Sequence, residues 1–393
     1  LMVLSLVMAA CGAAAPPMPT TPPMPTTPIT PTTPTTSVEK PAVKPTPEAA
    51  KYGGILRLPL NGDLTEWDTA RRPDPAHLAL THQGLWSGDW TKGNAGGYGT
   101  HETDWERNTN DVFALKEGVI AESTKWTADV AKNEGTIVYK IRQGIRYALN
   151  PGSDASRLVA GRELTADDVV FHLTRTVTDS FAYFPSAVPE LKGAKIIKTG
   201  PWEVTVKLPL EALLSGVSRF GDSTFIQAAE LVQKYGNLQN WKLSVGTGAF
   251  ILTDYVPSSQ AVYVRNPNYW MKDPIGPGKG NQLPYLDGIQ YLIIPDASTR
   301  QAALRTGKID QLPNLSLEDS ALMRKTAPEL KELQWAGSRL GAVGGNVNKP
   351  PLNNIRVRRA MMMSLDFNAI NQSLYGGKGQ IVTWPVSYFM EYA

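Results

Sequence analysis

A single cysteine, Cys11, stands among the 393 residues of this chain, so no disulfide within the chain can hold the fold together. The residues before it, from Leu1 to Ala10, are mostly apolar and too few to span a bilayer. Such a stretch is typical of the apolar region of a secretory signal. An exported chain without disulfides must obtain its stability from the burial of a large hydrophobic core.

The tract that follows Cys11 is built mainly from Pro, Thr, Met and Ala, up to about residue 36. It has too little bulky apolar surface to offset the entropy of ordering the chain. We therefore expect residues 12–50 to form a disordered, extended tether. The rest of the chain, from Lys51 onward, is long enough for two or more domains.

The run from Met8 to Cys11, Met-Ala-Ala-Cys, resembles the lipobox of bacterial lipoproteins. In that family the cysteine carries a diacylglycerol and becomes the new N-terminus, so the resemblance implies lipid attachment at Cys11. The protein would then be exported and held at a membrane, in the periplasm or at the cell surface. No basic segment precedes Leu1, and we expect the sequence to begin inside the signal, over residues 1–11. The alternative is a plain secretory peptide in which Cys11 has no role.

Charge and motif content argue against several classes of function. Lys and Arg total 39 against 36 Asp and Glu, and the basic residues form no stripe, so we expect no nucleic-acid partner. The spacing of His77 and His82 differs from the i, i+4 spacing that places two metal ligands on one helix face. Neither a nucleophile elbow nor a phosphate-binding loop is present in the sequence. We therefore expect no metal, no cofactor and no enzymatic activity.

Alternating apolar residues predict strands over residues 55–60, 135–142 and 202–208. A hairpin is expected over residues 250–264, with its turn at residues 257–259. Helices are interspersed with these strands, and this mixed order predicts an α/β architecture with mixed sheets.

Capping residues mark the expected helix starts. Thr165 and Asp168 have the spacing of a capping box. Ser316 is expected to cap a later helix, and Ser298 to cap one that ends at Gly307.

Several short blocks of sequence carry more information than composition does. They are Tyr52–Arg57, Ile120–Ser123 with Trp126, Tyr139–Arg146, Leu164–Phe171 with Arg175, Val245–Phe250, Arg265–Trp270, Leu283–Ile289, Gly307–Asp310 and Asn348–Ala360. In this order they resemble the bacterial extracellular solute-binding proteins of family 5, the oligopeptide-, dipeptide- and nickel-binding group that serves ABC importers.

The resemblance implies a two-lobed clamshell of the type II periplasmic-binding-protein class, α/β with mixed sheets. Lobe one would occupy residues 51–330 and include an inserted subdomain over about residues 85–244. Lobe two would begin at residue 331. The chain stops at Ala393 in sequence typical of mid-domain, so we expect a C-terminally truncated chain whose second lobe is incomplete.

In function, the resemblance implies the substrate-binding lipoprotein of an ABC transporter. Peptides would be captured in the cleft between the lobes, and the closed form would deliver them to the permease subunits in the membrane. Two alternatives stay open: an oligosaccharide-binding member of the same family, and a secreted carbohydrate-active hydrolase.

The same resemblance points to ligand-binding residues. In the family the turn after the first strand faces the cleft, which here indicates Asn61, Asp63 and Trp67. Thr247, inside a Gly-Thr-Gly turn, would lie at the hinge side of the cleft and hydrogen-bond a peptide main chain. The flanking Gly246 and Gly248 indicate a tight bend or a close backbone approach.

Three further candidates could contact other parts of a ligand. Arg339, in an expected strand over residues 335–343, offers a guanidinium to a ligand carboxylate. Trp86 and Trp90 could stack on a ligand side chain or on a sugar ring. The alternatives are a surface salt bridge for Arg339 and core packing for each tryptophan.

Overall fold

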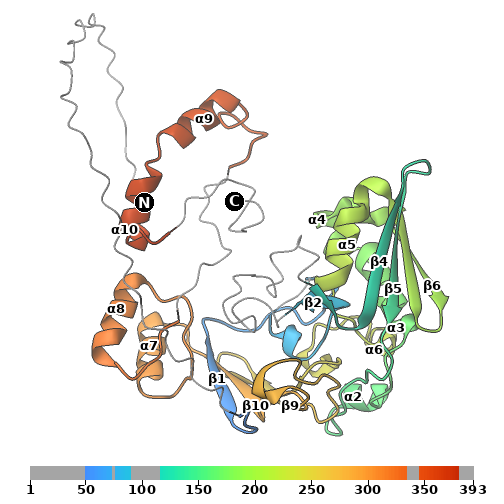
Figure 1. The fold of residues 1–393 in the computed structure, drawn as a ribbon, viewed down its shortest axis with the longest axis horizontal. Coiled ribbons are helices and arrows are strands. Elements are labelled where there is room, and N and C mark those ends of the chain that lie inside the picture. Colours follow the sequence, from blue (N-terminus) through green and yellow to red (C-terminus); the bar gives the residue numbers. More distant parts are fainter. Residues whose placement is uncertain (1–48, 73–75, 90–115, 334–344, 380–393) are drawn as a thin grey trace, which may run out of the picture. The chain divides into compact units, whose positions relative to one another are not determined.

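The computed structural model describes residues 49–72, 76–89, 116–333 and 345–379 (Figure 1). The predictions for Cys11, for the tether up to residue 48, and for Trp90 and Arg339 lie outside these residues.

A mixed sheet contains the first strand of the described chain. Its strand order is β1-β10-β9-β8, with β1 parallel to β10 and the other pairs antiparallel. The strands are β1 (Ile55–Leu60), β8 (Phe250–Val256), β9 (Gln260–Arg265) and β10 (Gly288–Ile293). The predicted first strand and the predicted hairpin are both confirmed.

A second sheet is antiparallel throughout, with the order β4-β5-β7-β6. It comprises β4 (Ala121–Asp129), β5 (Glu134–Ile141), β6 (Lys195–Gly200) and β7 (Glu203–Pro209). A short ribbon pairs β2 (Trp86–Gly88) with β3 (Lys116–Gly118). The strands predicted over residues 135–142 and 202–208 correspond to β5 and β7.

Helices lie between the strands along the chain. They are α2 (Asp154–Val159), α3 (Ala166–Thr178), α4 (Phe184–Ala187), α5 (Leu213–Asp222), α6 (Ala229–Tyr235), α7 (Ala297–Arg305), α8 (Leu317–Thr326), α9 (Ile355–Met363) and α10 (Phe367–Tyr375). Short 3₁₀ helices are η1 (Leu78–Leu80), η3 (Pro189–Gly193), η4 (Leu210–Ala212), η5 (Trp241–Leu243) and η6 (Gly276–Gly278). None of the helices in the described ranges has the length and apolar character that a bilayer crossing needs.

The predicted helix caps are largely confirmed. The main-chain N–H of Thr165 donates to Asp168 Oδ2 at 2.9 Å, and Ser316 Oγ accepts from the N–H of Asp319 at 3.0 Å. The prediction for Ser298 is wrong, because Asp296 caps α7 and accepts from the N–H of Thr299 at 2.7 Å. A carboxylate two residues earlier takes the capping position and leaves Ser298 inside the first turn.

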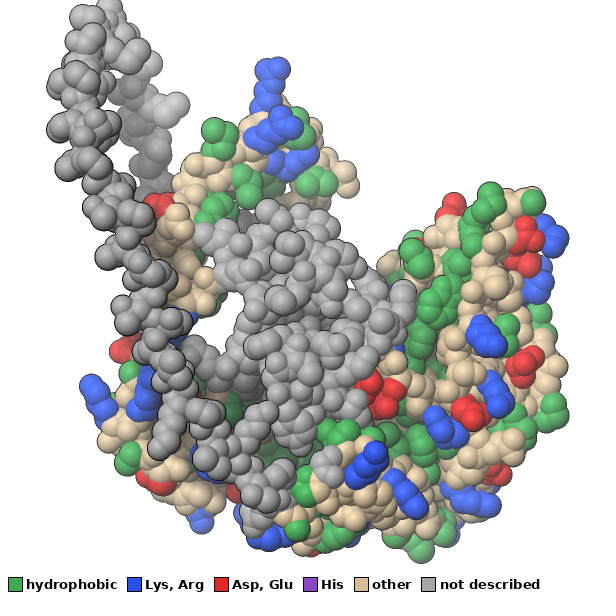
Figure 2. Space-filling view, viewed as in Figure 1, with side chains coloured by type: hydrophobic (Ala, Val, Ile, Leu, Met, Phe, Trp, Pro, Cys, Tyr) green, Lys and Arg blue, Asp and Glu red, His purple; other side chains and the backbone are tan. Residues whose placement is uncertain are grey.

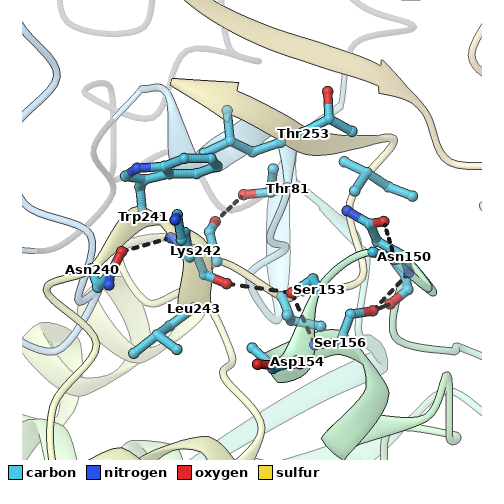
Figure 3. Close-up of a pocket in the computed structure, with 18 of the residues that line it drawn as sticks. Thr81, Asn150, Ser153, Asp154, Ser156, Asn240, Trp241, Lys242, Leu243 and Thr253 are labelled. Atoms are coloured by element: carbon cyan, nitrogen blue, oxygen red, sulfur yellow. Dashed lines mark hydrogen bonds between the residues drawn. The ribbon is translucent and has the colours of Figure 1, made fainter. Parts of the chain in front are cut away.

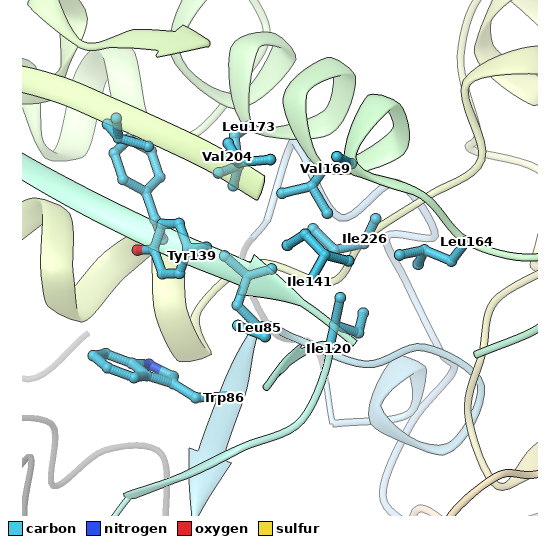
Figure 4. Packing of buried hydrophobic residues seen from close by; sticks show 14 of the residues in the cluster. Leu85, Trp86, Ile120, Tyr139, Ile141, Leu164, Val169, Leu173, Val204 and Ile226 are labelled. Atoms are coloured by element: carbon cyan, nitrogen blue, oxygen red, sulfur yellow. The ribbon is translucent and has the colours of Figure 1, made fainter. Parts of the chain in front are cut away.

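Two hydrophobic clusters stabilise the described residues. The larger draws its members from residues 85–245 and packs α3 and α5 against the antiparallel sheet. Figure 4 shows Val169 and Leu173 of α3 beside Ile141 and Val204 of the strands. The smaller cluster lies on the mixed sheet and includes Trp67. The domain boundaries, with an inserted subdomain over about residues 85–244, stay a prediction.

The last two described helices are solvent-exposed over most of their length. α9 carries Arg356, Arg358 and Arg359, and basic side chains gather on it in Figure 2. Met363 and Leu374 are among the exposed apolar side chains of α9 and α10. Apolar surface of this kind promotes association with other molecules.

Candidate ligand-binding site

The turn after β1 is attached to the β8–β9 hairpin through Asp63. One carboxylate oxygen accepts from the N–H of Ser258 at 2.6 Å and from the hydroxyl of Tyr255 at 2.9 Å, and the other accepts from Ser258 Oγ at 3.1 Å. The N–H of Ser258 and the Tyr255 hydroxyl hold the pKa of Asp63 below its ordinary value. Asn61, two residues earlier, is exposed.

Trp67 packs inside the smaller cluster and is 6% exposed. Its ring lies 4.7 Å from His77 and 5.4 Å from Tyr255, measured between centroids. Because Asp63 also bonds Tyr255, the structure brings Asp63 and Trp67 together around one tyrosine. Local sequence carried no signal for Tyr255, which comes from the far strand of the sheet.

A buried ion pair fixes the segment that follows Trp67. Arg175 of α3 donates to both oxygens of Asp68, at 2.7 and 2.5 Å, and the two side chains are 3% and 0% exposed. The N–H groups of Ala70 and Leu238 also donate to this carboxylate. Burial alone would raise the pKa of Asp68, but the hydrogen bonds and charge of Arg175 outweigh it and lower the pKa.

Two residues before Asp68, the main chain is strained. Glu66 has a left-handed φ of 68°, which is uncommon for a residue with a side chain. Its side chain accepts from Gln239 and pairs with Arg71 at 3.4 Å, and its carbonyl contacts His77 Nε2 at 3.1 Å. Backbone strain of this kind often marks ligand-binding segments, yet nothing in the local sequence pattern indicated it.

The Gly-Thr-Gly turn packs directly on the segment after η1. The N–H of Gly248 donates to the carbonyl of Thr81 at 2.9 Å. A Cβ at Gly246 would lie 2.2 Å from that carbonyl oxygen, and one at Gly248 would lie 2.5 Å from the oxygen of Leu80. The close backbone approach predicted from the glycines is therefore confirmed.

Thr247 is held between these two glycines with 1% of its surface exposed. Its hydroxyl has no hydrogen-bond partner among the described residues. Burial of a hydroxyl without a hydrogen-bond partner costs free energy, so a hydrogen bond from another molecule to this hydroxyl would be favourable.

Three histidines lie behind the turn as neutral core residues. Burial lowers the pKa of His77 and His82 to about 4 and that of His172 to about 3. His82 Nδ1 contacts Thr81 Oγ1 at 2.8 Å, whereas neither ring nitrogen of His172 has a partner in the described part of the chain. Over those same residues, no group of three His, Cys, Asp or Glu side chains is placed to hold a metal ion.

Trp86 belongs to the larger cluster and is 6% exposed. Its indole rests on Gly221, where a Cβ would lie 1.7 Å from the indole nitrogen, and it meets Trp126 edge-on at 6.4 Å. In this conformation Trp86 packs in the core, which is the alternative that the sequence left open for it.

A cavity of about 450 Å³ lies beside β8, and Thr81 and Gly246 are among the residues that line it (Figure 3). The loop before α2 forms one wall, η5 and the residues after it form another, and the outer strand β8 forms a third. The polar or aromatic side chains lining it include Asn150, Ser153, Asn240, Trp241, Lys242 and Thr253.

Several solved structures share this fold. The oligopeptide-binding protein AppA of Bacillus subtilis, solved with a nonapeptide, matches with a TM-score of 0.57 and 22% identity, over 85% of this chain and 58% of that chain. DppA of Helicobacter pylori, solved with the peptide STSA, matches with a TM-score of 0.58 and 19% identity, over 84% and 59%. NikZ of Campylobacter jejuni, solved with Ni(L-His), matches with a TM-score of 0.59 and 16% identity, over 84% and 57%. The fold is that of type II periplasmic binding proteins, as predicted.

The sequence profile of the bacterial extracellular solute-binding proteins, family 5 (middle region), matches residues 117–393, and this chain belongs to that family. Heme-binding protein A of Haemophilus influenzae is 27% identical over 301 residues, which cover 70% of this chain and 49% of that protein. The dipeptide-binding protein of Escherichia coli is 26% identical over 269 residues, covering 65% and 47%. The chain thus spans about half the length of the curated relatives it matches.

Proposed function

We propose that this protein is the substrate-binding component of an ABC importer and that peptides are its ligands. The observation that carries the proposal is the family match over residues 117–393. Relatives named for dipeptides and fold neighbours solved with peptides support the peptide class. These relatives are binding proteins, which favours reversible capture over catalysis.

The ligand site we propose lies where the turn after β1 meets the Gly-Thr-Gly turn. Asn61 offers an exposed amide, and Thr247 offers a hydroxyl that has no partner within the described residues. Asp63 and Trp67 hold the turn in place through Tyr255. Arg339 and Trp90 are proposed as further ligand contacts, from the family resemblance alone. Trp86 is proposed to contact a ligand only if closure exposes its ring.

Ligand classes other than peptides follow from other relatives. The family includes a heme-binding protein, and the fold neighbours include one solved with Ni(L-His) and one solved with mannopinic acid. Oligosaccharide capture remains the second candidate, because tryptophan rings suit sugar faces as well as peptide side chains.

Calorimetric titration of the purified protein distinguishes these classes. The panel contains di- and tripeptides, a nonapeptide, heme, Ni(L-His) and a neutral oligosaccharide. We expect saturable binding of peptides and no binding heat with the other ligands. Tight binding of one of the other ligands without any peptide binding, or release of a cleaved product from any of them, would contradict the proposal.

We also propose that the protein is exported and anchored by lipid at Cys11, with residues 12–50 as its tether. Proline-rich chain extends by about 3.1 Å per residue, so a tether of this length would reach on the order of 100 Å toward a permease. In a bacterial host, Cys11→Ala should move the protein from the membrane fraction to the soluble fraction, whereas Ser5→Ala should not. Membrane retention of the Cys11→Ala protein would rule out the anchor.

A further inference from the structure

The cavity beside β8 adjoins the proposed peptide site, because Thr81 and, from the Gly-Thr-Gly turn, Gly246 are among its lining residues. Its volume of about 450 Å³ falls within the range of roughly 300–1,000 Å³ found for small-molecule sites. None of Asn61, Asp63, Trp67, Trp86 and Thr247 lines it. A ligand held here would contact none of these five side chains, and would therefore occupy different side-chain contacts from the ligand of the proposed peptide site.

Two asparagine side chains, Asn150 and Asn240, belong to the lining of the cavity. Asn150 Oδ1 accepts from the N–H of Gly152 at 3.1 Å, and Asn240 Oδ1 accepts from the N–H of Lys242 at 3.0 Å. Each oxygen is thus occupied by the asparagine's own loop, which leaves both side-chain NH₂ groups to donate elsewhere. Figure 3 shows Asn150 and Asn240 on opposite sides of the cavity.

Lys242 is the basic residue in the lining of the cavity. Lys242 forms no ion pair within the described residues, and its ammonium lies 5.8 Å from the centroid of the Trp241 ring. The carboxylate in the lining, Asp154, is already paired with Arg157. Two amide donors and an unpaired ammonium are the groups that a carboxylate ligand would need.

β8, which forms one wall of the cavity, adds main-chain hydrogen-bonding groups. β8 is the outer strand of its sheet, and its residues Phe250–Thr253 line the cavity. An outer strand presents unpaired N–H and C=O groups that can pair with an extended peptide. The cavity therefore combines a strand edge with a cluster of donors for a negative group.

We propose that this cavity is a second binding site, and that its ligand is the C-terminal carboxylate end of an extended peptide. The carboxylate would lie between Lys242, Asn150 and Asn240, with the last residues of the peptide along β8. The same carboxylate chemistry is present in small organic acids, and the experiment below separates that source from a peptide.

Fluorine NMR of protein labelled with fluorotryptophan provides a local readout. The resonance of Trp241 is assigned by its loss in Trp241→Phe. Titration with N-acetyl-trialanine, which has a free C-terminal carboxylate and no free amine, should shift this resonance saturably. The same peptide with a C-terminal amide should bind at least about tenfold more weakly, and acetate should bind more weakly than the peptide acid.

Two lysine variants supply the matched comparison. Lys242→Gln should weaken binding of the peptide acid by about threefold to tenfold, because it removes the unpaired charge. Lys195→Gln removes the same charge from β6, outside the cavity, and should leave the affinity unchanged. The proposal is overturned by no Trp241 shift up to about 10 mM peptide, by equal affinity for acid, amide or acetate, or by parental affinity in Lys242→Gln.

Discussion

At the scale of single residues, Asp68 and Arg175 form the most deeply buried ion pair among the described residues, with one hydrogen bond to each carboxylate oxygen. Its partners come from the turn after β1 and from α3, so it fixes the proposed site to the larger hydrophobic cluster. Replacing one member leaves the other charge buried without compensation.

Asp68→Asn should therefore lower the free energy of unfolding by about 3–5 kcal/mol. Asp179→Asn is the matched control, because Asp179 accepts from the Nε of the same arginine at 3.0 Å but is 33% exposed. The control should cost no more than about 1 kcal/mol. Urea unfolding of both variants measures the difference, and equal losses would contradict a dominant role for the buried pair.

Thr247 provides a second test at this scale. Because its hydroxyl has no partner in the described residues, Thr247→Val removes an unsatisfied group and should leave the free energy of unfolding within about 1 kcal/mol of the parent. If the hydroxyl contacts a peptide main chain, affinity should fall about fivefold to tenfold.

Calorimetry with the tightest-binding peptide of the panel measures this loss. Thr178→Val on α3, whose hydroxyl donates to the carbonyl of Thr174, is the control and should bind normally. Parental affinity in Thr247→Val would remove Thr247 from the proposed site.

At the scale of elements, the close main-chain contact between the Gly-Thr-Gly turn and the end of η1 holds these two segments together. The Gly-Thr-Gly turn leads into β8, and it contacts Leu80 and Thr81, which belong to the chain segment that continues from Trp67. This contact therefore connects the turn after β1 to the turn that carries Thr247. A methyl group at either glycine would have to push apart two main chains.

Gly246→Ala should accordingly cost about 1–3 kcal/mol, since its Cβ would meet a main-chain oxygen that cannot rotate away. Gly62→Ala is the control, because a Cβ there would have nothing within 4 Å. Thermal unfolding of the two variants is the measurement. If the Gly246→Ala protein is as stable as the Gly62→Ala protein, the turn can move away from Thr81 without loss of stability, which would contradict the prediction.

At the scale of the whole molecule, buried neutral histidines make stability depend on pH. His77, His82 and His172 have pKa values of about 4, 4 and 3 in the folded protein, against an ordinary value near 6.5. At these three sites the unfolded state therefore binds more protons than the folded state as the pH falls from about 6.5 to about 4. The contribution of the histidines to the free energy of unfolding is fully present above about pH 6.5 and decreases as the pH falls. Glu117 on β3 has the opposite effect on stability: burial raises its pKa to about 7, so the folded state binds the proton more tightly and this site favours folding as the pH falls.

Unfolding by urea at pH 7 and at pH 5 should show a net loss at the lower pH, on the order of a few kcal/mol. His172→Phe removes the histidine with the lowest pKa and should reduce this loss. If the variant and the parent lose the same stability, His172 does not contribute to the acid sensitivity.

The comparison of sequence with structure separates two kinds of information. Alternation correctly predicted the strand over residues 135–142, in which Ile137, Tyr139 and Ile141 are buried, and Ser316 was correctly predicted as a cap. Both features depend on residues a few positions apart, because strand pleating and helix capping are local. Ordered sequence blocks identified the family, and the glycines around Thr247 indicated a close approach without revealing what was approached.

Tertiary structure alone decided which distant segments meet. Asp68 and Arg175 are 107 residues apart, and no local pattern pairs them. The choice between core packing and ligand stacking for Trp86 depended on the contact with Gly221, and the cavity at Lys242 depended on three separate segments. The amino-acid sequence by itself indicated an α/β fold with mixed sheets, together with some of its strands and helix starts, because periodicity and capping are local. The type II class came from the resemblance of the ordered blocks to family 5. The position of the site was decided by packing between elements, since that depends on the shapes of surfaces formed only after the chain has folded.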